Sequence, residues 1–207
     1  MVISVWLAFV AACVVFSFSP GAGMVATVSN TLNGGIRIAF KNIIGLQLAL
    51  CVHLLVVSLG LGALLASSAV AFTILKYCGA AYLIYLGVMK FRSKASLTAD
   101  ENTQLTAQST AKIIRQGFLI NMMNPKSIIF LAAFLPQFIS PEAPMAPQYL
   151  ILGLTVLVVD TVVMVTYASL ARSVQRFFRS SAAALWQNRV FGSMFIAMGG
   201  MLAAAER

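Results

Sequence analysis

The sequence predicts an all-α integral membrane protein, and three observations lead to that class. Hydrophobic residues make up 60% of the 207 residues and charged residues only 9%, whereas an ordinary soluble domain has about 45–50% apolar and about 25% charged residues. The mean hydropathy is +0.93. The apolar runs are continuous and about 20 residues long, as membrane-spanning helices require, whereas barrel strands are about 10 residues long and alternate in polarity.

Hydropathy predicts six transmembrane helices, at about residues 2–18, 39–66, 70–91, 117–137, 149–171 and 190–205. A polar stretch rich in Ser, Thr and Gln, residues 92–115, separates the third helix from the fourth and has the composition of a cytoplasmic linker. It divides the chain into two three-helix halves, residues 1–91 and 116–207. Because each half has an odd number of helices, the halves cross the membrane in opposite senses, as inverted repeats of secondary transporters do.

The first apolar run is predicted to remain as a membrane span. No Lys or Arg precedes it, so the positive region that begins a signal peptide is missing. The three cysteines, Cys13, Cys51 and Cys78, also lie inside apolar runs, with no CxxC pair and no metal-ligand spacing. We expect buried thiols there, and neither a metal site nor another cofactor.

The basic residues lie beside the apolar runs rather than in one patch. The formal net charge is +9, but this placement argues against a nucleic-acid partner. The basic residues gather in the first, third and fifth connections: Arg37 and Lys41; Lys90, Arg92, Lys94, Lys112 and Arg115; Arg172, Arg176, Arg179 and Arg189. The positive-inside rule makes these connections cytoplasmic, so both termini face outward. The arginines of the fifth connection are expected to contact anionic lipid headgroups.

Two prolines interrupt apolar segments at matching places in the two halves. Ser19-Pro20 opens the stretch SPGAGM, and Asn124-Pro125 lies inside the fourth span. Ser and Asn are good N-caps and Pro suits the first helical position, so each pair predicts the start of a half-helix within the membrane. Such an end offers free N–H groups and partial positive charge to a carboxylate. Gly21 and Gly23 would let a ligand approach the backbone. A proline kink without a ligand is the alternative.

Three titratable residues lie near the middle of predicted spans: Lys126, Asp160 and His53. A charge at that depth is costly, so each is a functional candidate. We expect Lys126 to add charge to the anion site and Asp160 to bind a substrate ammonium or carry a coupling proton. His53 could conduct protons. A structural Lys126–Asp160 ion pair and a buried neutral histidine are the alternatives. Interhelical hydrogen bonds are expected from Gln47, Asn121 and Tyr167.

These arguments give one set of candidate site residues. The predicted substrate-binding residues are Ser19, Pro20, Gly21, Gly23, Asn124, Pro125, Lys126 and Asp160, and the candidates for proton coupling are Asp160 and His53.

Four stretches resemble those of the LysE/RhtB family of amino-acid exporters. QGFLINMMNPKSIIFLAAFLPQF at 116–138 resembles the family's fourth span, and SPGAGM resembles its S/T-P-G-P motif. YCGAAYLIYLGVMKFRS at 77–93 and LVVDTVVMVTYASLA at 157–171 resemble the third and fifth spans. The resemblance covers essentially the whole chain. It implies a proton-coupled, bacterial inner-membrane exporter of amino acids or of derivatives such as homoserine and its lactone. Carried over by motif, the family's functional positions are Pro20, Gly21, Asn124, Pro125, Lys126 and Asp160.

The chain departs from the family's pattern at two places. Ala22 replaces the second proline of the first motif, and Ala49-Leu50 stands where many members carry Gly-Asp. The missing acid disfavours cationic substrates, so we expect export of a small neutral amino acid or derivative. The alternatives are export of a metal ion such as cadmium, a thiol carrier, or an enzyme acting on lipid-linked substrates. Those need paired cysteines, a carboxylate cluster or a His/Asp/Arg constellation, which the sequence does not offer, and we therefore expect no enzyme.

Small residues in the last span leave the oligomeric state open. Such residues allow close approach of helices, either between two copies in a homodimer or within one chain. The residues concerned are Gly192, Ser193, Gly199 and Gly200.

Overall fold

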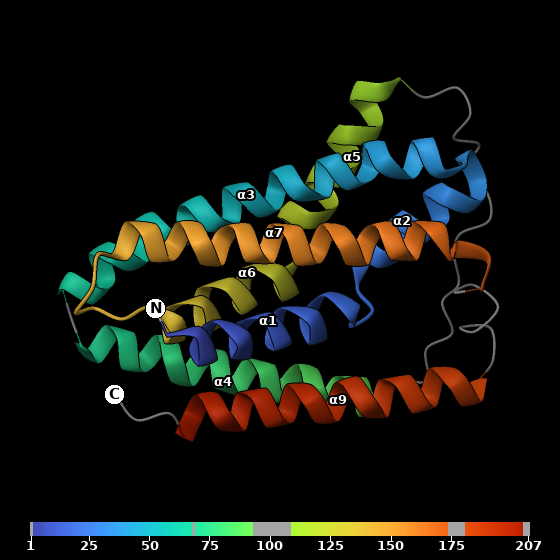
Figure 1. Ribbon diagram of the computed structural model, residues 1–207. Coiled ribbons are helices and arrows are strands. Elements are labelled where there is room, and N and C mark those ends of the chain that lie inside the picture. The colour runs from blue at the N-terminus through green and yellow to red at the C-terminus, as the bar shows by residue number, and fades with distance from the viewer. Residues whose placement is uncertain (1, 68, 93–108, 174–180, 205–207) are drawn as a thin grey trace.

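The computed structural model describes residues 2–67, 69–92, 109–173 and 181–204, and over these residues every regular element is a helix (Figure 1). The elements are α1 (Ile3–Phe18), α2 (Ala22–Gly34), α3 (Ile36–Ser67), α4 (Ala69–Arg92), α5 (Thr110–Met122), α6 (Pro125–Phe134), the 3-10 helix η1 (Leu135–Phe138), α7 (Met145–Ser169) and α9 (Ser181–Ala204). Helices occupy all six predicted stretches, which confirms the all-α class.

Two of the membrane segments are bent pairs of helices. α1 and α2 meet at an angle of 55°, and α5 meets the continuous segment of α6 and η1 at 54°. Each pair is long and apolar enough to cross a membrane if its two parts are taken together, and the stretches Ile36–Gly60 and Met145–Ser169 each meet that test alone. The helices predicted to break at Pro20 and Pro125 are therefore broken at those places.

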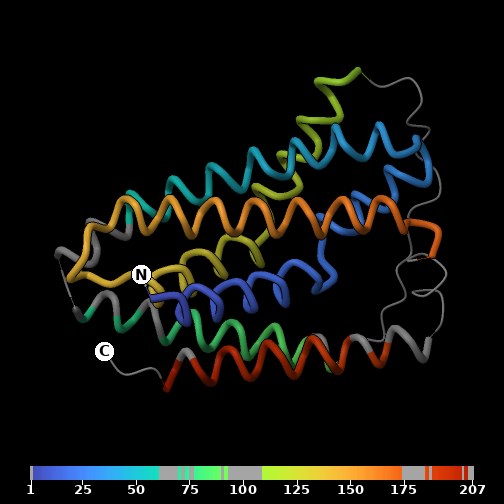
Figure 2. The backbone as a smooth tube through the Cα atoms, in the orientation of Figure 1, coloured from blue at the N-terminus to red at the C-terminus, as the bar shows by residue number. Residues whose placement is uncertain are grey.

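The order of a bent pair, a long helix and a further helix occurs twice along the chain. In Figures 1 and 2 the α1–α2 pair runs from left to right, whereas the α5–α6 pair runs from right to left. The two sets of helices thus have opposite directions, as predicted. α5 already begins at Thr110, inside the predicted linker, because the Ser109 hydroxyl caps it by accepting from the Lys112 amide at 3.3 Å. Most of that linker, residues 93–108, lies outside the described residues.

Glycines allow the closest helix contacts. A Cβ atom on Gly45 of α3 or on Gly117 of α5 would overlap the backbone of the facing helix. In the same way, a Cβ on Gly87 of α4 would stand 2.6 Å from the carbonyl oxygen of Gly192 on α9. Gly199 of α9 approaches the backbone of α4 as well. Gly192 and Gly199 therefore pack helices within one chain.

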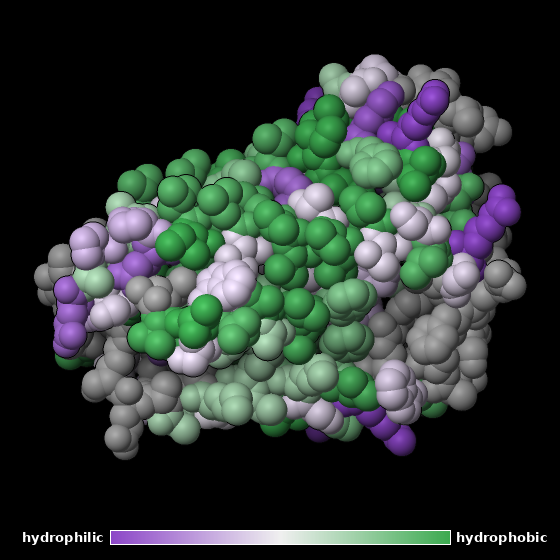
Figure 3. Space-filling view, in the orientation of Figure 1, coloured by the Kyte–Doolittle hydropathy of each residue, from purple (hydrophilic) through white to green (hydrophobic). Residues whose placement is uncertain are grey.

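The surface carries a broad apolar belt, as lipid contact requires. Figure 3 shows hydrophobic side chains across the middle of one face and hydrophilic side chains toward its two ends. Leu59 of α3 is 76% exposed, and Val158 and Val162 of α7 are 61% and 59% exposed. The α2–α3 turn, the start of α5 and the ends of α4 and α7 lie together at one end of the molecule. We call it the basic end, because the predicted cytoplasmic lysines and arginines that the structure describes lie there: Arg37, Lys41, Arg92, Lys112, Arg115, Arg172 and Arg189.

Five phenylalanines join α1 to α6 and η1. The Phe16 and Phe130 rings stack with centroids 3.9 Å apart. Phe134 lies next to Phe130, and Phe138 next to Phe134, with 5.0 Å between centroids in each pair. Phe9 completes the series by an edge contact with Phe138. This aromatic row packs the first bent pair against the second.

Candidate functional site

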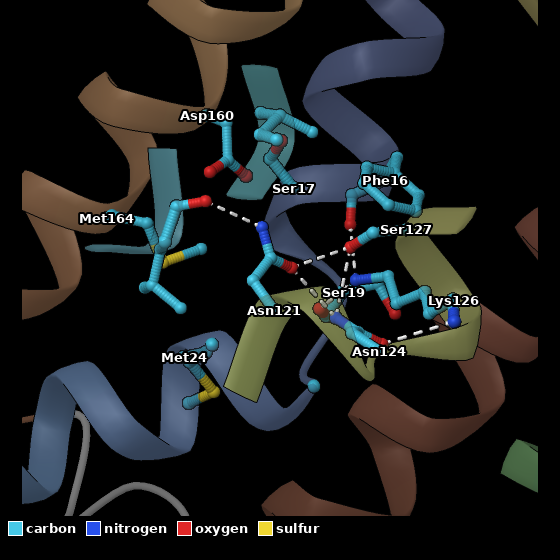
Figure 4. Close-up of a pocket in the computed structure, with 14 residues that line it drawn as sticks. Phe16, Ser17, Ser19, Met24, Asn121, Asn124, Lys126, Ser127, Asp160 and Met164 are labelled. Atoms are coloured by element: carbon cyan, nitrogen blue, oxygen red, sulfur yellow. Dashed lines mark hydrogen bonds between the residues drawn. The ribbon is translucent and has the colours of Figure 1, made fainter. Parts of the chain in front are cut away.

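A small cavity lies at the place where the two bent pairs break (Figure 4). Its volume is about 30 Å³, which is the space of a water molecule rather than of an amino acid. It is lined by Phe16, Ser17, Ser19, Gly21, Gly23, Met24, Leu46, Leu50, Asn121, Asn124, Lys126, Ser127, Asp160 and Met164. Most of the predicted substrate-binding residues are thus in its lining. Pro20 and Pro125 stand at the two breaks, and Pro125 is the first residue of α6.

The second break is closed by its own side chains. The Asn124 side-chain oxygen accepts from the Lys126 amide at 3.1 Å, and this caps α6 as predicted. The Asn124 amide group donates to Ser127 Oγ at 3.0 Å, and Ser127 Oγ donates to Asn121 Oδ1 at 2.9 Å. Asn121 in turn donates to the Leu46 carbonyl of α3 at 2.8 Å. These hydrogen bonds give partners to the side chains of Asn121, Asn124 and Ser127 at this break.

The first break has no such closure. Ser19 was expected to cap α2, and that expectation is wrong: Ser19 is the C-terminal cap of α1, and Gly21 stands at the N-cap of α2 without a side-chain cap. The first-turn N–H groups of a helix have no partners inside the helix. Gly21, Gly23 and Met24 of this turn line the cavity. Among the described residues the Ser19 hydroxyl, on a side chain only 1% exposed, has no hydrogen-bond partner.

Lys126 crosses from the second break to the first. Its ammonium donates to the carbonyl oxygens of Phe16 and Ser19 at 2.7 Å each. It also lies 4.4 Å from the centre of the Phe16 ring, within range of a cation–π interaction. The last carbonyls of a helix carry partial negative charge, so a cation is stabilised there. Lys126 thus binds the end of α1 in this conformation, although the sequence predicted a role at the start of α6.

Asp160 brings a carboxyl group to the cavity from the middle of α7. It accepts a hydrogen bond from the Gln47 amide of α3 at 2.8 Å, and the Ser17 hydroxyl lies beside it. Figure 4 shows Asp160 and Lys126 on opposite sides of the residues drawn, with Asn121 and Ser127 between them. Both side chains line the cavity; Lys126 donates to carbonyls at the end of α1, and Asp160 accepts from Gln47 of α3.

His53 lies outside the lining of this cavity. Its Nε2 stands 3.4 Å from the carbonyl oxygen of Met122, the last residue of α5. A matching contact occurs in the other half, where the Tyr167 hydroxyl donates at 2.6 Å to the carbonyl of Phe18, the last residue of α1. Each long central helix thus holds the broken end of a helix from the opposite half. The interhelical bonds predicted for Gln47, Asn121 and Tyr167 are all present.

Several lining residues escaped the sequence analysis. Met24 and Met164, 1% and 6% exposed, form an apolar wall of the cavity. Phe16 faces Lys126, and Ser17 stands beside Asp160. In a chain with so many apolar residues, a methionine or phenylalanine that lines a site looks like one that faces lipid. Ser17 did carry a signal, because it is a polar residue at the end of an apolar run.

The described residues offer no cluster of three or more His, Cys, Asp or Glu side chains that could hold a metal ion. Cys13, Cys51 and Cys78 are free thiols.

The cavity is lined by one cationic and one carboxylic side chain, and it lies where two helices of opposite direction are broken. These are features of inverted-repeat helical membrane proteins, a class in which broken helices form a polar site. Within that class the chain belongs to the LysE family, because the model of the LysE type translocator matches residues 14–206. No solved structure matches the chain.

Relatives of similar length support this assignment. A membrane protein of Vibrio cholerae is 46% identical over 206 residues, which cover 100% of both chains. A homoserine/homoserine lactone efflux protein of Salmonella typhimurium is 42% identical over 201 residues, or 97% of each chain. A leucine efflux protein of Salmonella choleraesuis is 26% identical over 125 residues, which cover 60% of this chain and 58% of that protein.

Proposed function

We propose that this protein exports a small neutral amino acid or a close derivative from the cytoplasm, and that homoserine and homoserine lactone represent its substrate class. The observation that carries the proposal is the cavity at the two breaks. It combines an uncapped helix N-terminus with the ammonium of Lys126 and the carboxyl group of Asp160, both on half-buried side chains. These groups complement the two charges of a zwitterion. The efflux relatives, at 42% identity over 97% of each chain, support the same class.

The carboxylate of the substrate is assigned to the first turn of α2. The corresponding turn of α6 already has Asn124 as its cap, so its amides are less available. The α2 turn is bordered by Gly21 and Gly23, and the Ser19 hydroxyl lines the same cavity. A helix N-terminus stabilises an anion through its N–H groups and its partial positive charge. The apolar wall of Met24 and Met164 favours an uncharged substrate side chain over a cationic one.

Export is proposed to be coupled to protons, with Asp160 as the first candidate to carry the coupling proton. Asp160 is the carboxylate in the cavity lining, and its bonds with Gln47 and Ser17 hold it in place. His53 of α3, whose ring contacts the last carbonyl of α5, stays a second candidate. The basic end is proposed to face the cytoplasm of a bacterial inner membrane, with both termini outside and its arginines against anionic lipids.

A growth-inhibition panel tests the function. Cells that overproduce the protein are challenged with excess homoserine, homoserine lactone, leucine, other neutral amino acids, lysine and cadmium. We expect resistance to one class of neutral amino acid or its derivative. Resistance to a substrate with a free carboxylate, such as homoserine, should fall at least about tenfold in Lys126→Ala and in Asp160→Asn, since each removes an ionisable group from the cavity.

Matched variants control for expression and general charge effects. Lys112 and Glu142 are exposed, so Lys112→Ala and Glu142→Gln should retain full resistance at equal amounts of membrane-inserted protein. Unchanged resistance in both Lys126→Ala and Asp160→Asn would contradict the proposed site. Resistance to cadmium alone, or to nothing, would contradict amino-acid export itself.

A further inference from the structure

The end of α1 forms a binding site for a primary ammonium group. Two carbonyl oxygens, of Phe16 and Ser19, converge on one point, and the Phe16 ring flanks it. An alkylammonium ion has three donors and is attracted to aromatic faces, so this is a complementary set of groups. The partial negative charge at a helix C-terminus adds to the attraction. We call the two carbonyls and the ring the ammonium cage, and in this conformation the ammonium of Lys126 fills it.

The ammonium cage lies beside the proposed carboxylate site. Both belong to one chain break, since only Pro20 and Gly21 separate the Ser19 carbonyl from the first turn of α2. A Cβ atom on Gly21 would be 3.7 Å from Lys126 Nζ, which shows how near the two sites are. The ammonium and carboxylate of an amino acid are attached to the same carbon. One broken helix therefore offers carbonyls to the first group and amides to the second.

Building on the proposed function, we propose that the ammonium cage is the substrate's ammonium subsite and that Lys126 is an internal ligand displaced by the substrate. In the exchange, the substrate ammonium takes the carbonyls of Phe16 and Ser19. The released Lys126 ammonium then pairs with the substrate carboxylate at the first turn of α2. The small cavity volume of about 30 Å³ fits this scheme, because the lysine occupies space that the substrate later takes. Asp160 is left for the coupling proton.

Homoserine and homoserine lactone separate the two roles of Lys126. Both carry the α-ammonium, but only homoserine carries a free carboxylate, since the lactone closes it into a ring ester. Removing Lys126 deprives homoserine of the partner of its carboxylate. The same change removes the competitor that both compounds must displace from the ammonium cage, which is the whole effect for the lactone but is outweighed for homoserine by the loss of its carboxylate's partner. The two affinities are therefore expected to move in opposite directions.

The test is a titration of purified protein in lipid nanodiscs at about pH 6, where both amines are protonated. Wild type, Lys126→Ala and the surface control Lys112→Ala are each titrated with homoserine and with homoserine lactone. In Lys126→Ala the Kd for homoserine should rise about tenfold or more, the effect of one lost charge-assisted hydrogen bond. The Kd for the lactone should fall about threefold or more. Both constants should stay unchanged in Lys112→Ala.

If Lys126→Ala does not fold, Lys126→Met takes its place, because it keeps an aliphatic stem to pack on Phe16 and has no ammonium. An equal rise of both dissociation constants, or no change in the lactone's, would overturn the exchange of ligands while leaving amino-acid binding by the wild type intact. Binding of neither compound by the wild type would instead defeat the proposed function, and the exchange together with it.

Discussion

The two helix breaks begin from similar sequences and end in different chemistry. Asn124-Pro125 starts a helix whose first turn is capped by Asn124 and tied to Asn121 and Ser127. Ser19-Pro20 ends one helix and precedes another by two residues, and no side chain caps the second helix. The second break is thus stabilised by hydrogen bonds among its own residues. The first offers carbonyls on one side and amides on the other, and receives Lys126 from across the cavity.

This difference shows how an inverted repeat can yield an asymmetric site. The halves share a supporting contact, because Tyr167 and His53 hold the last carbonyls of α1 and α5 respectively. They differ in the groups placed at the break itself. The second break is held by its own side chains, and the first is the one proposed to receive the substrate. The proposed zwitterion site thereby takes its carbonyls and free amides from the first half, and Lys126 and Asp160 come from the second.

Loss of the Asn124 cap should have the largest effect of the changes that test this comparison. Asn124→Ala removes the acceptor for the Lys126 amide and the donor to Ser127. We expect unfolding in detergent to become easier by about 2 kcal/mol, the sum of a lost cap and a lost buried hydrogen bond. Asn124→Ser should recover part of the loss, since serine also caps. Exposed Asn33→Ala is the control and should change stability by less than about 0.5 kcal/mol.

If Asn124→Ala were as stable as wild type, the second break would not be supported by its side chains, and the contrast between the breaks would disappear.

A methyl group at Gly21 should weaken substrate binding while leaving the fold intact. Its Cβ would meet Lys126 Cδ at 3.5 Å and Nζ at 3.7 Å, which are ordinary contacts. The backbone of Gly21 has φ −158°, an extended conformation that alanine also adopts. The methyl group would nevertheless stand between the α2 amides and Lys126, where the carboxylate is proposed to bind. We expect the Kd for homoserine in Gly21→Ala to rise about tenfold, or about 1.4 kcal/mol.

Gly60→Ala is the matched control, since a Cβ there meets nothing within 4 Å. An unchanged Kd in Gly21→Ala would place the carboxylate elsewhere in the cavity.

The sequence alone predicted the helices, both breaks and several of the residues that line the cavity. The length of the apolar runs indicates where helices cross the membrane. The Asn124-Pro125 pair predicts a helix start, because Asn124 directly precedes the first helical residue and its side chain caps the helix. The same prediction failed at Ser19. Serine caps the start of a helix only when it directly precedes the first turn, and here Pro20 and Gly21 lie between Ser19 and α2. The direction of the Lys126 side chain was also beyond sequence, since its carbonyl partners lie more than a hundred residues away.

Ser19→Ala should have the smallest effect on stability and so completes the comparison. The Ser19 hydroxyl is buried, caps no helix and has no hydrogen-bond partner among the described residues. Its removal leaves no new unsatisfied group, so the unfolding free energy should change by less than about 0.5 kcal/mol, against about 2 kcal/mol for Asn124→Ala.

If that hydroxyl serves the bound carboxylate, the Kd for homoserine should still rise, by roughly threefold to tenfold. Stability and homoserine titrations on the same samples check both values. A destabilisation equal to that of Asn124→Ala would show that the first break, too, is held by its own polar side chain.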